Sequence, residues 1–222
     1  MTPPAPRWLY LHGFASGPDS AKGVALARHY EDRGIFLQRL NLRVPSLERL
    51  SLSAALQVTR DAIGEARDRV VIFGSSLGGL TAALTAQEDP RVCALVLLAP
   101  AFDLLGRWRR RMTPEAWDDW ETSGWLPIDD FAHGTRARLH YDFVRDVADV
   151  EARLGAWPDV RVPTLVVHGR NDETVPIAGS RAWAGGKRHI RLVEVDDNHD
   201  LVVTLERIAA EADTHLAGFL GP

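Results

Sequence analysis

A serine lies between two glycines where an apolar, β-branched run gives way to a stretch rich in alanine and leucine. The stretch reads VVIFGSSLGGLTAALTAQ over residues 70–87, and its GSSLG at 74–78 fits the pattern G-x-S-x-G. In this pattern a tight turn from a strand into a helix presents the hydroxyl of the middle serine at the carboxyl edge of a sheet. The pattern therefore predicts that Ser76, and not Ser75, is a nucleophile. The alternative is a tight turn with an incidental serine.

A serine hydroxyl needs a base within hydrogen-bond reach and a group that orients this base. With a G-x-S-x-G turn these partners follow in the order serine, acid, histidine, each after a later strand. TLVVHGRNDETVP supplies Asp172 just past an apolar run, and IRLVEVDDNHDL supplies His199 after the last such run. The order predicts Asp172 as the acid and His199 as the base. Asp103 also follows an apolar run and is the alternative acid, whereas His168 is expected to pack under the loop that carries Asp172.

Two backbone N–H groups are candidates for stabilising an oxyanion on an attacked carbonyl group. The amide of Leu77 follows Ser76 at a predicted helix N-terminus, where N–H groups point toward a developing negative charge. The residues His12-Gly13-Phe14 follow the first apolar run, and the glycine permits a turn that aims the Phe14 N–H at Ser76. The alternative is a strand-ending turn with a packing histidine. Together these residues predict acyl transfer through a serine, which requires no metal and no cofactor.

Short apolar runs that alternate with helical stretches must position these residues. The runs are Trp8–Leu11, Ile35–Leu40, Val70–Phe73, Ala94–Leu98, Thr164–Val167 and Ile190–Val195. The helical stretches are Ser20–Arg33, Ser53–Ala66, Leu77–Gln87, Ala178–Ala184 and Leu201–Leu216. Nearly continuous Val, Ile and Leu are typical of parallel strands that are covered on both faces. The alternation predicts an α/β fold with a mostly parallel six-stranded sheet flanked by helices.

The segment 103–163 interrupts this alternation and is expected to be a helical cap inserted after the fourth strand. It is rich in aromatic residues, among which Trp108, Trp117, Trp120 and Trp125 are candidates for lining a substrate pocket. An aromatic lid over an acyl pocket and simple packing of a small cap on the sheet are both open interpretations. The basic run RWRRR at 107–111 is either a clamp for a substrate carboxylate or phosphate, or a solvated helix face.

Length and composition limit the remaining possibilities. The chain has 222 residues, 45% hydrophobic and 25% charged, which favours a single domain spanning 1–222. A net charge of −4 does not indicate nucleic-acid binding, and a single cysteine excludes an internal disulfide framework. No stretch reaches the roughly 20 apolar residues that span a bilayer. The proline-rich start MTPPAPR has no apolar core of a signal peptide, so a cytoplasmic location is expected.

The motifs LHGF, GSSLGG, HGRNDETVP and NHDL, in this order, resemble the α/β-hydrolase superfamily. The string YLHGFASGPDSAKG, followed by FGSSLGG and LAPA, is similar to the small YqiA-type esterases. The resemblance implies the same roles for Ser76, Asp172, His199 and the two amides. It also implies a sheet that lacks the first two strands of the superfamily, with the strand order 2-1-3-4-5-6. One departure is Asn198, which stands where a glycine commonly precedes the histidine.

The expected function is hydrolysis of carboxylic esters or thioesters of small to medium acyl substrates, through an acyl-enzyme on Ser76. Peptidase, lipase and acyltransferase reactions use the same groups, and a fold alone does not choose among them. A non-catalytic protein that binds a small molecule in the same pocket is the alternative from another class.

Overall fold

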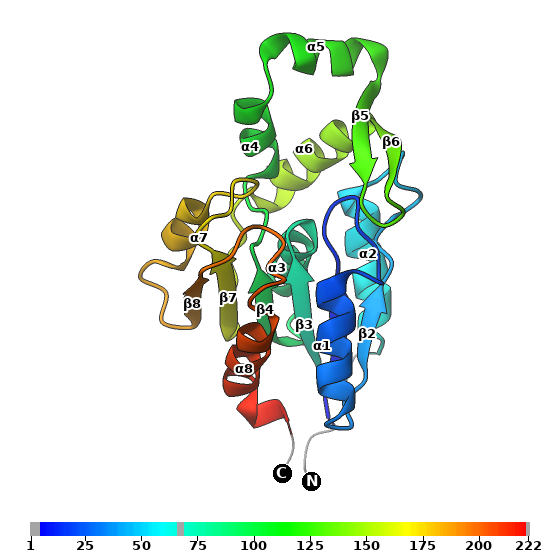
Figure 1. Ribbon diagram of the computed structural model, residues 1–222. Helices are drawn as coiled ribbons and strands as arrows, with labels where there is room; N and C mark the ends of the chain where they lie inside the picture. Colours follow the sequence, from blue (N-terminus) through cyan, green and yellow to red (C-terminus); the bar gives the residue numbers. More distant parts are fainter. Residues whose placement is uncertain (1–4, 66–68, 221–222) are drawn as a thin grey trace.

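A six-stranded parallel sheet forms the centre of the molecule (Figure 1). The structure is a computed structural model, and it describes residues 5–65 and 69–220. The strands of this sheet, in chain order, are β1 (Arg7–Leu11), β2 (Leu37–Leu40), β3 (Val70–Ser75), β4 (Val92–Leu98), β7 (Thr164–Gly169) and β8 (Ile190–Val195). Their spatial order is β2-β1-β3-β4-β7-β8, and neighbouring strands pair in parallel. The predicted fold class and the implied strand order are confirmed.

Helices cover both faces of the sheet (Figure 1). They are α1 (Ala21–Glu31), α2 (Leu52–Ile63), α3 (Leu77–Glu88), α7 (Ile177–Ala184), α8 (Leu205–His215) and the short 3₁₀ helix η1 (Ala217–Phe219). Alternate residues of each central strand enter different cores, because successive side chains of a strand point to opposite faces. In β3, Ile72 packs with the core of α2 and α3, whereas Phe73 packs with the core of α1 and α8. This double burial explains why the strands read as continuous apolar runs.

Two predicted helix boundaries differ from the structure by more than two residues. The helix expected over 53–66 ends at Ile63, and Ala66 lies outside the described residues, as do the first four residues of the chain. The helix expected from Leu201 begins only at Leu205. Leu201 has φ +51°, and the Asp197 carboxylate accepts hydrogen bonds from the amide and hydroxyl of Thr204. The side chain of Asp197 thus fixes a turn here in place of a helical one.

Most of the segment 103–163 lies beyond the carboxyl ends of the strands, at the top of Figure 1, and its last residues return to the start of β7. It contains α4 (Leu104–Arg111), α5 (Pro114–Ser123), α6 (Asp142–Leu154) and an antiparallel hairpin of β5 (Trp125–Asp130) and β6 (Thr135–His140). The expectation that this insertion is purely helical is wrong in respect of the hairpin. Its strands are largely solvent-facing and carry charges such as Asp129, Arg136 and Arg138, so they lack the apolar run of a buried strand.

A buried ion pair fastens the hairpin to the body of the protein. Both guanidinium NH₂ groups of Arg43 donate to the Asp130 carboxylate, over 2.8 Å and 2.7 Å. Only 8% of the Asp130 side chain and 15% of the Arg43 side chain are exposed. Hydrogen bonds from Arg43 and then from His133 lower the pKa of the Asp130 carboxyl far below its ordinary value, against the effect of burial. The amide of Ala132 in the hairpin tip also donates to the Ala15 carbonyl, so the tip rests on the loop after β1.

We expect Asp130→Asn to lower the free energy of unfolding by about 2 kcal/mol at pH 7, because hydrogen bonds to a charged partner are lost. Since the folded-state pKa lies below the unfolded value, this stabilisation is complete above the unfolded pKa and declines as the pH falls. The difference in free energy of unfolding between the native protein and Asp130→Asn is therefore expected to be about 1 kcal/mol smaller at pH 3 than at pH 7, since an unfolded Asp titrates at about 3.9. Urea unfolding of both proteins at both pH values measures this difference. Asp129→Asn is the control, because this neighbouring carboxylate is exposed. Equal losses in the two variants would contradict the assignment.

Candidate active site

Ser76 occupies the sharp turn between β3 and α3. It has φ +54° and ψ −115°, a left-handed conformation that costs energy for a residue with a side chain. Two glycines permit the turn. A Cβ on Gly74 would meet the Gly78 carbonyl oxygen, and a Cβ on Gly78 would meet the carbonyl oxygens of Leu11 and His12. The spacing of the motif is therefore a packing requirement that brings β1, β3 and α3 together around the serine.

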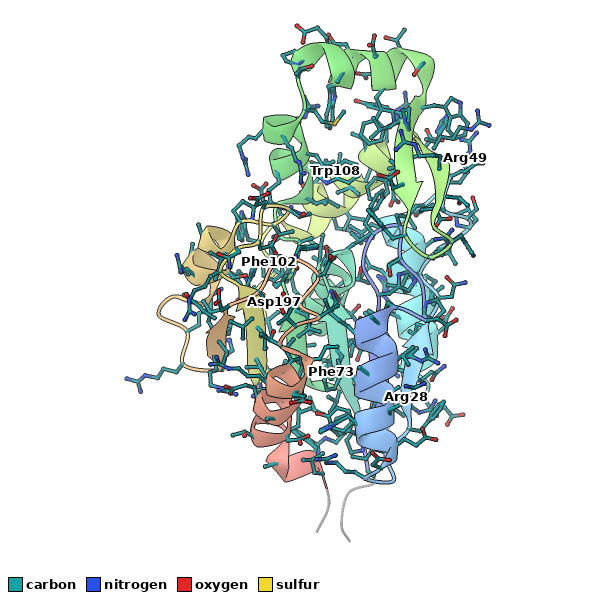
Figure 2. All side chains as sticks on the ribbon, viewed as in Figure 1. Arg28, Arg49, Phe73, Phe102, Trp108 and Asp197 are labelled. Atoms are coloured by element: carbon teal, nitrogen blue, oxygen red, sulfur yellow. The ribbon has the colours of Figure 1, made fainter. Side chains whose placement is uncertain are left out.

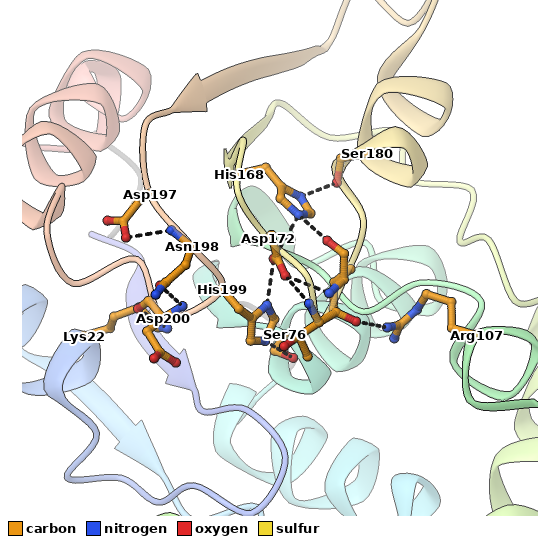
Figure 3. Close-up of polar contacts among 12 residues, drawn as sticks. Lys22, Ser76, Arg107, His168, Asp172, Ser180, Asp197, Asn198, His199 and Asp200 are labelled. Carbon is orange, nitrogen blue, oxygen red and sulfur yellow. Dashed lines mark hydrogen bonds and ion pairs between the residues drawn. The ribbon is translucent and has the colours of Figure 1, made fainter. Parts of the chain in front are cut away.

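A continuous line of hydrogen bonds joins Ser76, His199 and Asp172 (Figure 3). The His199 Nε2 lies 3.1 Å from the Ser76 Oγ, and its Nδ1 lies 2.7 Å from the Asp172 Oδ2. Because an ionised carboxylate only accepts hydrogen bonds, Nδ1 carries the proton and Nε2 is left to accept from the serine hydroxyl. These residues follow β3, β8 and β7, whose carboxyl ends share one edge of the sheet. The structure thus brings the three predicted residues together.

The Asp172 carboxylate is fully buried and accepts several hydrogen bonds. The amides of Thr174 and Val175 donate to Oδ1 over 2.9 Å and 2.7 Å. The His168 Nε2 lies 3.1 Å from Oδ2, which His199 also contacts. Burial alone would raise the pKa of this carboxyl, but the hydrogen bonds from His168, His199 and Val175 lower it well below the ordinary range. Asp172 is therefore ionised at neutral pH.

His168 is more closely engaged with the acid than the sequence indicates. As predicted, it packs under the Asp172 loop, and its side chain has no exposed surface. Its Nδ1 lies 2.8 Å from the Ser180 Oγ, and its Nε2 lies 2.8 Å from the Val175 carbonyl oxygen. The sequence signal for this contact is the position of His168 at the end of β7, directly before the loop that carries Asp172. The second histidine restrains the carboxylate from the side opposite the base.

The loop that carries His199 is tied down at several points. The Asp197 carboxylate accepts from the Asn198 amide over 2.8 Å, and the Asn198 side-chain oxygen accepts from the Asp200 amide over 2.9 Å. The Lys22 Nζ donates to the Asp200 carbonyl oxygen over 2.6 Å, which links α1 to this loop (Figure 3). Asn198 is not among the residues of positive φ, so the loop does not need the glycine usual at this position.

The two amides proposed as oxyanion donors are free to bind a ligand. Within residues 5–65 and 69–220, neither the Phe14 nor the Leu77 N–H donates to a protein acceptor. The loop that carries Phe14 is fixed by His12, whose Nε2 accepts from the Leu42 amide over 3.0 Å. The His12 Nδ1 accordingly donates to the Gly13 carbonyl over 2.8 Å. Burial lowers the pKa of His12, so this ring is neutral, and its two hydrogen bonds connect the loop after β1 to Leu42.

Two cavities meet at Ser76. The first, the apolar cavity, has a volume of about 420 Å³ and is lined by Phe14, Ser76, Leu77, Ala101, Leu104, Arg107, Trp108, Arg111, Met112, Leu126, Ile128, Phe143, Thr174 and Val175. The second, the polar cavity, has a volume of about 850 Å³ and contains His199 with Lys22, Asn171, Glu173, Asn198 and Asp200. A bound ester would have room for one substituent on each side of the serine.

One of the four candidate tryptophans lines the apolar cavity. Trp108 lies where the insertion meets the sheet (Figure 2), and its ring centroid is 5.4 Å from that of Phe14. Trp117 and Trp120 are buried in the core, and the Trp120 Nε1 donates to the Leu139 carbonyl. Trp125 lies on the hairpin, with the Arg138 guanidinium 4.0 Å above its ring. The prediction that these three line the pocket is wrong, because they join the helices and the hairpin of the insertion to each other.

Asp103, the alternative acid, lies elsewhere. Its carboxylate accepts from Arg110 over 2.7 Å at the start of α4, and it makes no contact with His199 in the described part of the chain.

None of the helices within residues 5–65 and 69–220 has the length and apolar character that a membrane span requires.

Comparison with known proteins identifies a family model that matches most of the chain. A family model described as "Uncharacterised protein family (UPF0227)" matches residues 7–212. A search of curated proteins found no significant match.

Solved structures share the fold at low sequence identity. Alpha/beta hydrolase domain-containing protein 10 from mouse superposes with a TM-score of 0.80 at 19% identity, covering 98% of this chain and 92% of that one. Est1E from Butyrivibrio proteoclasticus gives a TM-score of 0.71 at 23% identity, over 97% and 90% of the two chains. A monoacylglycerol lipase from Paleococcus ferrophilus gives 0.66 at 16% identity, over 95% and 96%. At these identities the likeness establishes a common fold.

Proposed function

The chain belongs to the uncharacterised protein family UPF0227, and from the geometry of its site we propose that it is a serine hydrolase. Its substrates in this proposal are carboxylic esters or thioesters of small to medium acyl groups. The observation that carries the proposal is the hydrogen-bonded line from Ser76 through His199 to Asp172, which lies beside a cavity with apolar walls. Two neighbours of the same fold are named as an esterase domain, from Rhodothermus marinus, and as a monoacylglycerol lipase, which supports hydrolysis as the reaction class.

The reaction would begin with attack of the Ser76 Oγ on the acyl carbonyl carbon. His199 Nε2 takes the hydroxyl proton as the new C–O bond forms, and the carbonyl oxygen becomes an oxyanion. The ionised Asp172 keeps the imidazole in the tautomer that accepts this proton and stabilises its charged form. The amides of Phe14 and Leu77 donate to the oxyanion, and losing one such donor typically raises the barrier by about 3–4 kcal/mol.

The second half of the reaction would release the product and regenerate the serine. His199 returns the proton to the leaving oxygen or sulfur as the bond to the acyl carbon breaks. Water then attacks the acyl carbon while His199 takes its proton, and His199 returns this proton to the Ser76 Oγ as the acyl–Oγ bond breaks and the carboxylic acid leaves. Because His199 lies in the polar cavity and not in the apolar one, the leaving group would occupy the polar cavity and the acyl chain the apolar cavity.

A fluorophosphonate reagent tests this proposal directly, because it modifies only a serine that is activated as a nucleophile. We expect intact-mass analysis to find one adduct on the native protein and none on the Ser76→Ala variant. Turnover of p-nitrophenyl esters of graded acyl length is expected in parallel. A folded protein that takes up no adduct and hydrolyses no ester or thioester would favour a binding protein over an enzyme.

A further inference from the structure

Helix α4 sorts the basic run RWRRR into two faces. Arg107, Trp108 and Arg111 line the apolar cavity, and residues four apart lie on one side of a helix. The other two arginines have partners of their own. The Arg109 guanidinium lies 4.4 Å above the Trp117 ring, and Arg110 forms the ion pair with Asp103. The run is thus neither one solvated face nor one clamp, and two of its charges are directed at the proposed acyl pocket.

Arg107 brings a charge into the cavity without a carboxylate partner. Its Nε donates to the Phe102 carbonyl over 2.8 Å, and one NH₂ group lies 3.4 Å from the Thr174 carbonyl oxygen (Figure 3). Burial lowers the pKa of Arg107 to about 10, while the nearby Asp103 and Asp172 raise it, so the group is charged at neutral pH. It forms no ion pair with any described residue.

Arg111 is still less engaged. Within residues 5–65 and 69–220 it forms no hydrogen bond, ion pair or ring contact, although it lines the same cavity. Three acidic groups near α4 already have partners. Asp103 binds Arg110, Asp172 binds the two histidines, and the Glu151 carboxylate accepts from the Leu105 amide. The protein therefore supplies two cations here and leaves their remaining donors unused.

The composition of the cavity indicates which substrate group would pair with these two cations. Apart from these arginines, Ser76 and Thr174, its walls are apolar, with Trp108, Met112, Leu126, Ile128 and Phe143 among them, and they suit a chain of methylene groups. A plain fatty acyl chain would cover the half-buried Arg107 guanidinium without pairing it, which is unfavourable for a partly desolvated charge, whereas Arg111 is exposed at the rim of the cavity. A carboxylate is the complementary group, since it accepts two hydrogen bonds from a guanidinium fork. Ser76 and both arginines line the same cavity, so an acyl group attached to Ser76 would extend toward the arginines.

We propose that the acyl group of the substrate ends in a carboxylate, so that this protein acts on monoesters or monothioesters of dicarboxylic acids, with Arg107 and Arg111 binding the distal carboxylate. This proposal rests on the proposed serine hydrolase function. In this proposal the protein selects its substrates by the acyl group, which binds in the apolar cavity, and not by the leaving group, which binds in the polar cavity beside His199.

The test compares p-nitrophenyl monoesters of adipate and suberate with the p-nitrophenyl esters of hexanoate and octanoate, which have the same chain lengths. We expect kcat/KM of the native protein to favour the monoesters by about tenfold or more at low salt. Arg111→Gln is expected to lower this ratio about tenfold, mainly through KM. Arg111 is preferred to Arg107 for the test because its guanidinium forms no hydrogen bond or ion pair with a described residue, whereas Arg107 lies 3.4 Å from the Thr174 carbonyl oxygen. Arg109→Gln is the matched control, since it removes the same charge from the part of α4 that faces Trp117 and not the cavity, and it is expected to keep the ratio.

The outcomes separate the two proposals. Turnover of neutral esters without a preference for monoesters, or a preference that survives in Arg111→Gln, would overturn the carboxylate subsite and leave the hydrolase intact. If no ester is hydrolysed, the hydrolase proposal fails, and binding then tests the subsite. In that case calorimetry with suberate monomethyl ester and the Ser76→Ala variant should detect binding that is lost when Arg111→Gln is added. Absence of binding, or equal binding in the double variant, would overturn the subsite.

Discussion

Replacing Ser76 with alanine is expected to lower ester hydrolysis by about 10⁴- to 10⁶-fold, the range typical of removing a serine nucleophile. The substitution deletes the Oγ that would attack the carbonyl carbon and that lies 3.1 Å from the His199 Nε2. It retains the Cβ, so the turn between β3 and α3 keeps its backbone conformation. Steady-state turnover with a p-nitrophenyl ester measures the loss, and thermal unfolding shows whether the variant is folded.

The neighbouring Ser75 provides the control for this experiment. It precedes the turn at the end of β3, and it has no hydrogen bond to His199. Ser75→Ala is therefore expected to stay within about tenfold of the native rate, since surface or packing changes near a site are small beside loss of the nucleophile. If Ser76→Ala kept more than about 1% of the activity, the nucleophile assignment would be wrong, because nucleophile loss costs far more.

The second large effect is expected for Asp172→Asn, at about 10⁴-fold in kcat. The amide would present an NH₂ group to the His199 Nδ1 and favour the tautomer protonated on Nε2. That tautomer cannot accept the Ser76 proton, although every heavy atom lies where it did before. The remaining side-chain oxygen of the asparagine can still accept from the Thr174 and Val175 amides, so the loop is expected to keep its shape.

Histidine NMR separates this change of tautomer from simple loss of folding. The native protein should show His199 protonated on Nδ1, and the variant should show it protonated on Nε2. Asp103→Asn is the comparison, because Asp103 is the rival acid and contacts Arg110. If Asp103→Asn lost more kcat than Asp172→Asn, the acid would be Asp103, and the assignment of this role to Asp172 would be wrong.

Apolar patterning determined the central sheet because both faces of every inner strand are buried. Val70–Phe73 supplies side chains to two cores, and a short continuous apolar run of this kind, flanked by helices, is typical of a buried parallel strand. Apolar patterning did not predict the hairpin of β5 and β6. Its residues face solvent on a small two-stranded sheet, and their charges conceal the alternation that marks a half-buried strand.

The candidate residues were also accessible from the sequence, since each follows a recognisable strand. Parallel strands end at one edge of a sheet, so Ser76, Asp172 and His199 were predicted to meet there. The sequence by itself thus determined the fold class, the order of the strands by resemblance, and the residues that the loops carry. These properties depend on local patterns and on the order of elements along the chain.

Only the tertiary structure decided how the rest of the molecule surrounds that edge. It directed Trp108 and Arg107 into the cavity, while Trp117 and Trp120 became packing residues of the same insertion. It also placed His168 against the carboxylate that His199 contacts. Helical spacing groups side chains on a face, but which face turns inward depends on contacts between segments far apart in the chain. Those contacts arise from the packing of whole elements, and no short stretch of sequence encodes them.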